Sequence, residues 1–69
     1  MKDFLVQLMG KKVDVSCGLS AVVRGEIVDV KDGILYLRDE EERVCYVAIE
    51  KIAVVWELKE HENRAGFVV

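Results

Sequence analysis

The first ten residues have the hydrophobic spacing of a short amphipathic helix. Apolar side chains recur at positions i, i+1, i+4 and i+5, which share one face of a helix: Phe4, Leu5, Leu8 and Met9. Gly10 follows them and can adopt the left-handed conformation that ends a helix. The pattern therefore predicts a helix over residues 3–9. Because such a short helix is unstable by itself, it must lie against another element.

From Lys12 onward apolar and polar residues alternate, which is the pattern of β-strands with one solvated face. Turn-forming residues and charged runs interrupt this pattern at residues 18–20, 32–33, 39–43 and 50–51. Five strands are predicted between them, over residues 12–17, 21–30, 34–37, 44–49 and 52–58. The remaining residues are polar and have no period. We therefore interpret residues 1–58 as one domain and residues 59–69 as a C-terminal tail.

The second predicted strand changes its apolar face midway. Val23, Gly25 and Ile27 share one phase, whereas Val28 and Val30 hold the other. Such a change needs a bulge or a sharp bend, and Gly25, which has no Cβ atom, is the predicted place for it. Strongly bent strands close small barrels. We therefore predict a mainly β protein with a short N-terminal α-helix and a five-stranded, strongly bent antiparallel barrel. Its predicted core contains Val13, Val15, Val23, Ile27, Leu35, Leu37, Val47 and Val54.

The fourth and fifth predicted strands are apolar on both faces. A strand at the open edge of a sheet is normally protected by charge or proline, but these two carry almost no charge before Glu57. We therefore predict a homo-oligomer, most simply a closed ring of about five to eight subunits, in which the fourth strand of one copy pairs with the fifth strand of the next. The residues predicted at this interface are Tyr46, Val47, Ile52, Val54 and Trp56.

Composition limits the classes of function. Hydrophobic residues make up 52% of the 69-residue chain and charged residues 33%, which indicates a single folded domain rather than a disordered chain. The formal net charge is −3, so overall charge does not predict binding to nucleic acid or to an anionic membrane. The chain also contains no apolar run long enough for a membrane span or a signal peptide. A cytoplasmic protein without a membrane partner is expected.

Catalytic and metal-binding chemistry is sparse. The single histidine, His61, lies in the charged tail without a second ligand at a suitable spacing. Cys17 and Cys45 lie in apolar strands, where we interpret them as small buried residues in a reducing compartment. No glycine-rich phosphate loop is present, and no base accompanies the serines. We therefore expect neither enzymatic activity nor a cofactor or metal.

The order of these elements resembles the Sm-like barrel of Sm, LSm and Hfq proteins. Phe4-Leu5-Val6-Gln7-Leu8 resembles the F-L-x-x-L of the Hfq helix, and residues 25–30 resemble the G-x-[IL]-x-x-[FV] segment of the first Sm motif. Ile34-Leu35-Tyr36-Leu37 is similar to the apolar third strand. Tyr46-Val47-Ala48-Ile49 is similar to the Hfq sequence Y-K-H-A-I with one residue missing. The resemblance covers about residues 3–57 and implies ring assembly and RNA binding.

The departures from this pattern affect the nucleic-acid site. Lys31 stands where the first motif commonly has an aspartate, and Leu35 stands where Sm proteins carry the asparagine that contacts uridine. The second motif lacks both the Arg-Gly of Sm proteins and the Lys-His of Hfq, which leaves Lys51 as the cation at that corner. A fold shared with a family does not by itself fix the function.

Two hypotheses follow from these observations. In the first, a ring binds single-stranded RNA, with uridine-rich sequences the first to test, as an RNA-binding or RNA-chaperone module. Its predicted RNA-binding residues are Lys51, Lys31, Tyr36 and Arg38. In the second, the same fold is a homo-oligomeric assembly or protein-interaction module without a nucleic-acid role. Salt-dependent binding of a uridine-rich oligonucleotide separates the two.

Overall fold

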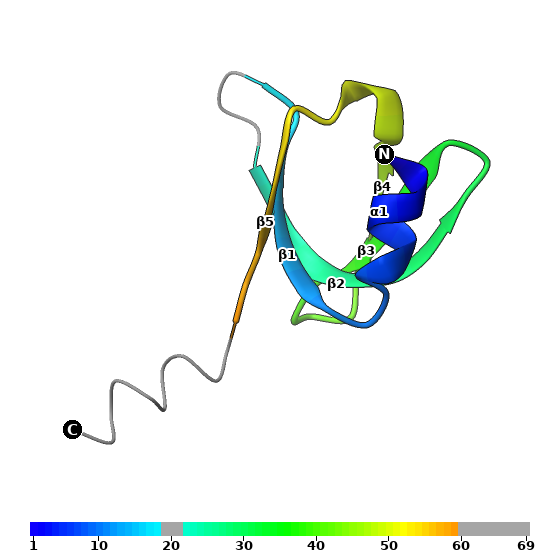
Figure 1. Ribbon diagram of the computed structural model, residues 1–69. Coiled ribbons are helices and arrows are strands. Elements are labelled where there is room, and N and C mark those ends of the chain that lie inside the picture. Colours follow the sequence, from blue (N-terminus) through cyan, green and yellow to red (C-terminus); the bar gives the residue numbers. More distant parts are fainter. Residues whose placement is uncertain (19–21, 60–69) are drawn as a thin grey trace.

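The computed structural model of the protein describes residues 1–18 and 22–59. Its elements, in chain order, are α1 (Lys2–Gln7), β1 (Lys12–Ser16), β2 (Val22–Lys31), β3 (Ile34–Arg38), β4 (Val44–Ala48), the 3₁₀ turn η1 (Ile49–Lys51) and β5 (Val54–Glu57). The strands form one antiparallel sheet in the order β4-β3-β2-β1-β5 (Figure 1). The mainly β class, with one short N-terminal helix and five strands, is thus confirmed. The tail predicted from residue 59 falls almost wholly outside the described residues.

The sheet is strongly bent at β2. Figure 1 shows β1 and β5 on one side and β3 and β4 on the other, joined by the curved β2. The bend coincides with a bulge, because Ile27 pairs with Leu37 and Asp29 pairs with Tyr36, which leaves Val28 without a direct partner. The predicted location at Gly25 was therefore wrong. The extra residue at Val28 is what moves the buried phase of the strand from Ile27 to Val30.

Gly25 has a different role, which is to let β3 approach β2 closely. A Cβ atom at this position would lie 2.9 Å from the backbone oxygen of Arg38. Real Cβ atoms essentially never approach backbone this closely, so any side chain here would push the two strands apart.

The core lies on the concave face of the sheet, beneath α1. Its buried residues are Leu5, Leu8, Val13, Val15, Ile27, Val30, Leu35, Leu37 and Val47. The segment after α1 is tied to β2 by two backbone hydrogen bonds, from Gly10 N to Ile27 O at 2.9 Å and from Ile27 N to Lys11 O at 3.0 Å. The helix therefore contributes its Leu5 face to the core and is not independent of the sheet.

Two of the predicted core residues lie elsewhere. Val54 is 43% exposed, and Val23 is only half-buried, although it packs against the core. In β5 the inward residue is Val55, because it pairs with the buried Val15 and directly paired residues share a face. Val54 therefore points outward. Because β5 is apolar on both faces, its sequence alone does not show whether Val54 or Val55 points into the core.

The prediction that both cysteines are buried was also wrong. Cys17 and Cys45 are exposed free thiols. Cys17 follows the end of β1, beyond the last paired residue. Cys45 shares its phase with the buried Val47, but β4 is the last strand on its side of the sheet, so the described chain supplies nothing to cover it.

Candidate functional site

The two edge strands carry exposed apolar side chains. On β4, Tyr46 is 67% exposed, and Val44 and Cys45 are exposed beside it. On β5, Trp56 is 65% exposed, and Val54 is exposed on the same face. The pairing between described residues joins β4 only to β3 and β5 only to β1. Each strand therefore presents one row of backbone N–H and C=O groups that the sheet does not use.

A tyrosine pair lies next to the β4 edge, on the outer face of the sheet. Tyr36 of β3 pairs directly with Tyr46 of β4, and their rings meet edge to face with centroids 5.2 Å apart. Lys31 Nζ lies 5.8 Å from the Tyr36 ring centroid and 3.9 Å from Asp29 Oδ2. The structure therefore brings together two of the predicted RNA-binding residues, Lys31 and Tyr36. Tyr46, which was predicted at the interface, joins the same cluster.

The other two predicted RNA-binding residues lie apart from this cluster. Arg38 is exposed at the end of β3, where its Nη2 atom donates to Glu26 Oε1 at 3.0 Å. Lys51 is exposed on η1 beside Glu50. Within the described residues no hydrogen bond, ion pair or ring contact joins Lys51 to the Tyr36 cluster. The four residues therefore do not form one preassembled pocket within a single chain.

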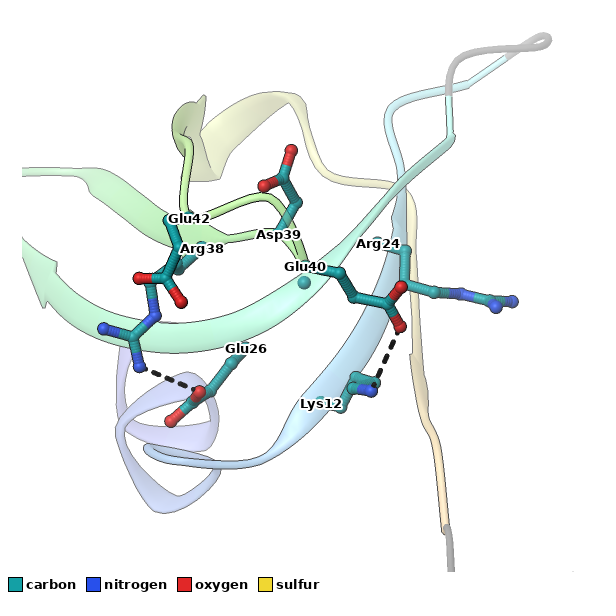
Figure 2. Close-up of a pocket in the computed structure, with 8 residues that line it drawn as sticks. Lys12, Arg24, Glu26, Arg38, Asp39, Glu40 and Glu42 are labelled. Atoms are coloured by element: carbon teal, nitrogen blue, oxygen red, sulfur yellow. Dashed lines mark hydrogen bonds and ion pairs between the residues drawn. The ribbon is translucent and has the colours of Figure 1, made fainter.

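A charged hollow of about 210 Å³ lies at the opposite end of β3. It is lined by Lys12, Arg24, Gly25, Glu26, Arg38, Asp39, Glu40 and Glu42. Figure 2 shows two ion pairs among these residues: Lys12 Nζ is 3.6 Å from Glu40 Oε2, and Arg38 Nη2 is 3.0 Å from Glu26 Oε1. Arg24 points away and instead holds Asp14, with Nε 2.7 Å from Oδ1. Paired and exposed charges of this kind are typical of a solvated surface.

The loop between β3 and β4 is organised by Asp39. Its Oδ1 atom accepts hydrogen bonds from the backbone N–H groups of Glu41 and Arg43, each at 2.9 Å. These bonds, led by that from Arg43, hold the pKa of Asp39 below its ordinary value. The side-chain hydrogen bond from Arg24 likewise lowers the pKa of Asp14. Both carboxylates are stabilised in the charged form, whereas a general acid at neutral pH needs a raised pKa.

Neither a metal cluster nor a membrane-spanning helix is found in the part of the chain that the structure describes. Among residues 1–18 and 22–59, no three histidine, cysteine, aspartate or glutamate side chains are placed to hold a metal ion. Within the same residues, no helix has the length and hydrophobicity needed to cross a bilayer.

Comparison with protein families assigns the chain to one family. Residues 1–58 match the model of a family described as Domain of unknown function (DUF6897). The chain belongs to this family. The matched range contains every helix and strand described above, from α1 to β5. No curated protein and no solved structure matches the chain.

Sequence analysis missed the partners of the charged residues and the contact between the two tyrosines. Alternation in 34–37 and 44–49 places Tyr36 and Tyr46 on outward faces, but only the register of the hairpin sets them opposite each other. The Asp39 to Arg43 spacing is the one local signal that was available, because an aspartate at the start of a turn commonly accepts backbone hydrogen bonds.

Proposed function

We propose that the protein is a self-assembling module of the Sm-like type, in which copies join through β4 and β5 into a closed ring. The observation that carries this proposal is that both edges of the sheet are open and apolar, with Tyr46 on one edge and Trp56 on the other. Monomeric proteins normally protect such edges. Head-to-tail pairing in a closed ring covers both edges at once, whereas a two-fold dimer through one edge leaves the other open.

The element order supports the Sm-like form of this assembly. A short N-terminal helix precedes five antiparallel strands, the second strand is strongly bent, and a 3₁₀ turn joins the fourth strand to the fifth. That turn carries β5 away to the opposite edge of the sheet from β4 (Figure 1). Each copy therefore offers one β4 edge and one β5 edge, as a ring requires.

The test is sedimentation velocity of the wild type and of two charge variants at micromolar concentration. Val54→Lys places a charge on the β5 edge, and Val6→Lys places the same charge on α1, which is not a strand of the sheet. The two valines are matched in exposure, at 43% and 44%. We expect an oligomer for the wild type and for Val6→Lys, and a folded monomer for Val54→Lys. A well-folded wild-type monomer would refute the proposal.

A second candidate function, single-stranded RNA binding, is favoured by the Tyr36, Tyr46 and Lys31 cluster. Aromatic rings beside a cation are the kind of surface on which unpaired bases stack, at about 1 to 3 kcal/mol per base. Arg38 lies at the far end of the same strand and Lys51 on η1, and repetition around a ring would multiply each cation. Glu50 beside Lys51, and the net charge of −3, oppose this.

Titration of labelled oligouridine and oligoadenosine at low and moderate salt tests this candidate. The variants are Tyr36→Ala and Lys51→Ala, with Lys2→Ala on α1 as a control lysine. If RNA binds, Tyr36→Ala should weaken affinity, and Lys51→Ala should reduce the slope of log affinity against log salt by about one unit. If neither oligonucleotide binds the wild type below about 10 μM at low salt, the assembly module remains without the RNA role.

A further inference from the structure

The directions of the edge strands restrict how two copies can join. Four successive antiparallel pairings separate β4 from β5 in the sheet. Each pairing reverses the strand direction, so β4 and β5 run the same way along the sheet. Two copies with the same face up would therefore meet β4 to β5 as a parallel pair. An antiparallel pair requires the second copy to be turned over, so that the inner face of one copy continues as the outer face of the next.

Antiparallel pairing is the form that every other strand pair of this sheet adopts. It is also slightly more stable per residue than parallel pairing. The turned-over arrangement places the inner residues of β4, Cys45 and Val47, on the same side as the outer residues of β5, Val54 and Trp56. The two strands overlap fully when Cys45 is opposite Trp56 and Val47 is opposite Val54.

This register accounts for two features that the single chain leaves unexplained. Cys45 belongs to the inner face but is exposed, because nothing in the described chain lies beyond β4. Trp56 belongs to the outer face and is a large apolar side chain left in solvent. In the turned-over pair, the indole of Trp56 covers the thiol of Cys45 in the other copy. Tyr46 then lies on the side of Val55 of the next copy, so each core is extended by an edge strand of the other copy, on opposite sides of the joined sheet.

Charge favours this register over pairing of β4 with itself. In the register that sets Cys45 opposite Trp56, Glu42 of one copy is level with Lys59 of the next. Glu42 precedes β4 and Lys59 follows β5. A two-fold pair centred on Tyr46 would instead bring Glu42 level with Glu50 of the other copy at both ends. Like charges placed directly opposite each other destabilise strand pairs.

We propose that copies of this chain join face-inverted, with Trp56 of one copy covering Cys45 of the next. This inference rests on the proposed assembly through β4 and β5 and adds the contact that specifies it. The interface is thereby formed by an apolar layer that neither copy completes alone, and its occupant is a second copy of the chain.

Disulfide trapping tests the contact. The background is Cys17→Ser, so that Cys45 is the remaining thiol, and the full chain receives either Trp56→Cys or Val55→Cys. Diamide is the oxidant: each bond that forms between two thiols releases two protons and two electrons, which reduce diamide to its hydrazine. Directly opposed residues in antiparallel strands have Cα separations of about 4.5 to 5.5 Å, within the range that a disulfide spans.

We expect Trp56→Cys to give a ladder of covalent dimers and larger species, because each copy then carries one thiol at each edge. Val55→Cys, whose side chain lies on the other side, should give several-fold less, and the background with Cys45 alone should give none. Stronger trapping with Val55→Cys would overturn the inverted faces, and a dimer with Cys45 alone would overturn the register in favour of β4 paired with itself. In both of these cases the protein still assembles, whereas failure of the assembly proposal itself appears as a monomer in sedimentation.

A second measurement keeps the native tryptophan in place. The rate of Cys45 alkylation by iodoacetamide, read by mass spectrometry, should be at least tenfold lower in the wild type than in the monomeric variant Val54→Lys. Val6→Lys should retain the wild-type rate. Equal rates in the wild type and in Val54→Lys, with the wild type oligomeric, would show that Cys45 is not covered and would overturn the proposal.

Discussion

The middle of the sheet and its two edges are built from similar residues but stand in opposite relation to solvent. In the middle, Leu35 and Leu37 of β3 are fully buried beneath α1. At the edges, Tyr46 and Trp56 are large aromatic side chains but about two-thirds exposed. The difference indicates that folding of a single chain buries the apolar residues in the middle of the sheet. The large side chains at the edges become buried only when a second chain lies against them.

The largest expected effect is on the middle of the sheet. Leu35→Ala should lower the free energy of unfolding by about 2 to 5 kcal/mol, because it leaves a cavity beneath α1. The measurement is urea unfolding in the Val54→Lys background, where dissociation does not contribute to the transition. Val6→Ala, on the exposed side of α1, should change the same free energy by less than about 0.5 kcal/mol. A loss below 1 kcal/mol for Leu35→Ala would contradict the assignment of this core.

The close approach of β2 and β3 can be tested in the same background. Gly25→Ala should lower the free energy of unfolding by about 1 to 3 kcal/mol, because the new Cβ atom meets the Arg38 backbone oxygen and β3 must shift. Val22→Ala, at an exposed position of the same strand, is the control. Equal stability of the two variants would mean that the strands tolerate a side chain at this point.

The element types could be predicted from sequence better than the details of their packing. Alternation and the Asp32-Gly33 turn located the strands to within a few residues, because these signals are local. The choice between Val54 and Val55 for the core was wrong, because β5 is apolar on both faces and only its pairing with β1 decides. The bulge was assigned to Gly25 rather than Val28 for a similar reason. A glycine can mark either a bend in its own strand or a close approach of the neighbouring strand. Only the register of the sheet shows which of these two roles Gly25 has.

The candidate site was less predictable than the fold. Exposed apolar edges were anticipated, since a lack of charge in residues 44–49 and 52–56 is visible in the sequence. The exposure of Cys45 was not, because it depends on β4 being the last strand of the sheet. The separation of Lys51 from the Tyr36 cluster also depends on the tertiary arrangement, which spacing along the chain does not contain.

The edge should respond to mutation differently from the middle. Trp56→Ala should raise the concentration at which half of the protein is assembled by at least tenfold, which corresponds to about 1.4 kcal/mol. In the Val54→Lys background, the same change should alter the free energy of unfolding by less than about 0.5 kcal/mol, because the indole touches little within its own chain. Sedimentation over a range of concentrations and urea unfolding give the two quantities. If Trp56→Ala lowered the stability of the monomer and left assembly unchanged, Trp56 would belong to the core of its own chain and not to the interface.

The smallest expected effect concerns pH and the two aspartates with lowered pKa. Asp14 and Asp39 have folded-state pKa values below that of an unfolded aspartate, so each adds stability at neutral pH. That contribution is lost as the pH falls from the unfolded value, about 3.9, through the lower folded value. Thermal unfolding of the Val54→Lys variant should therefore show a melting temperature that falls below about pH 4. Asp39→Asn should flatten this decrease, whereas Val22→Ala, which changes no titratable group, should leave it unchanged. An identical pH profile for Asp39→Asn would show that its hydrogen bonds do not contribute.

Hydrogen–deuterium exchange followed by mass spectrometry tests the central claim most directly, because it compares the middle and the edges in one experiment. The wild type is compared with Val54→Lys at the same micromolar concentration. We predict that peptides containing β4 and β5 exchange more slowly in the wild type than in the variant, since their outer backbone groups are paired only in the assembly, while peptides from β1 to β3 exchange equally. Equal exchange of β4 and β5 in the two proteins, at the rate of an open edge, would contradict the claim that a second copy covers these strands.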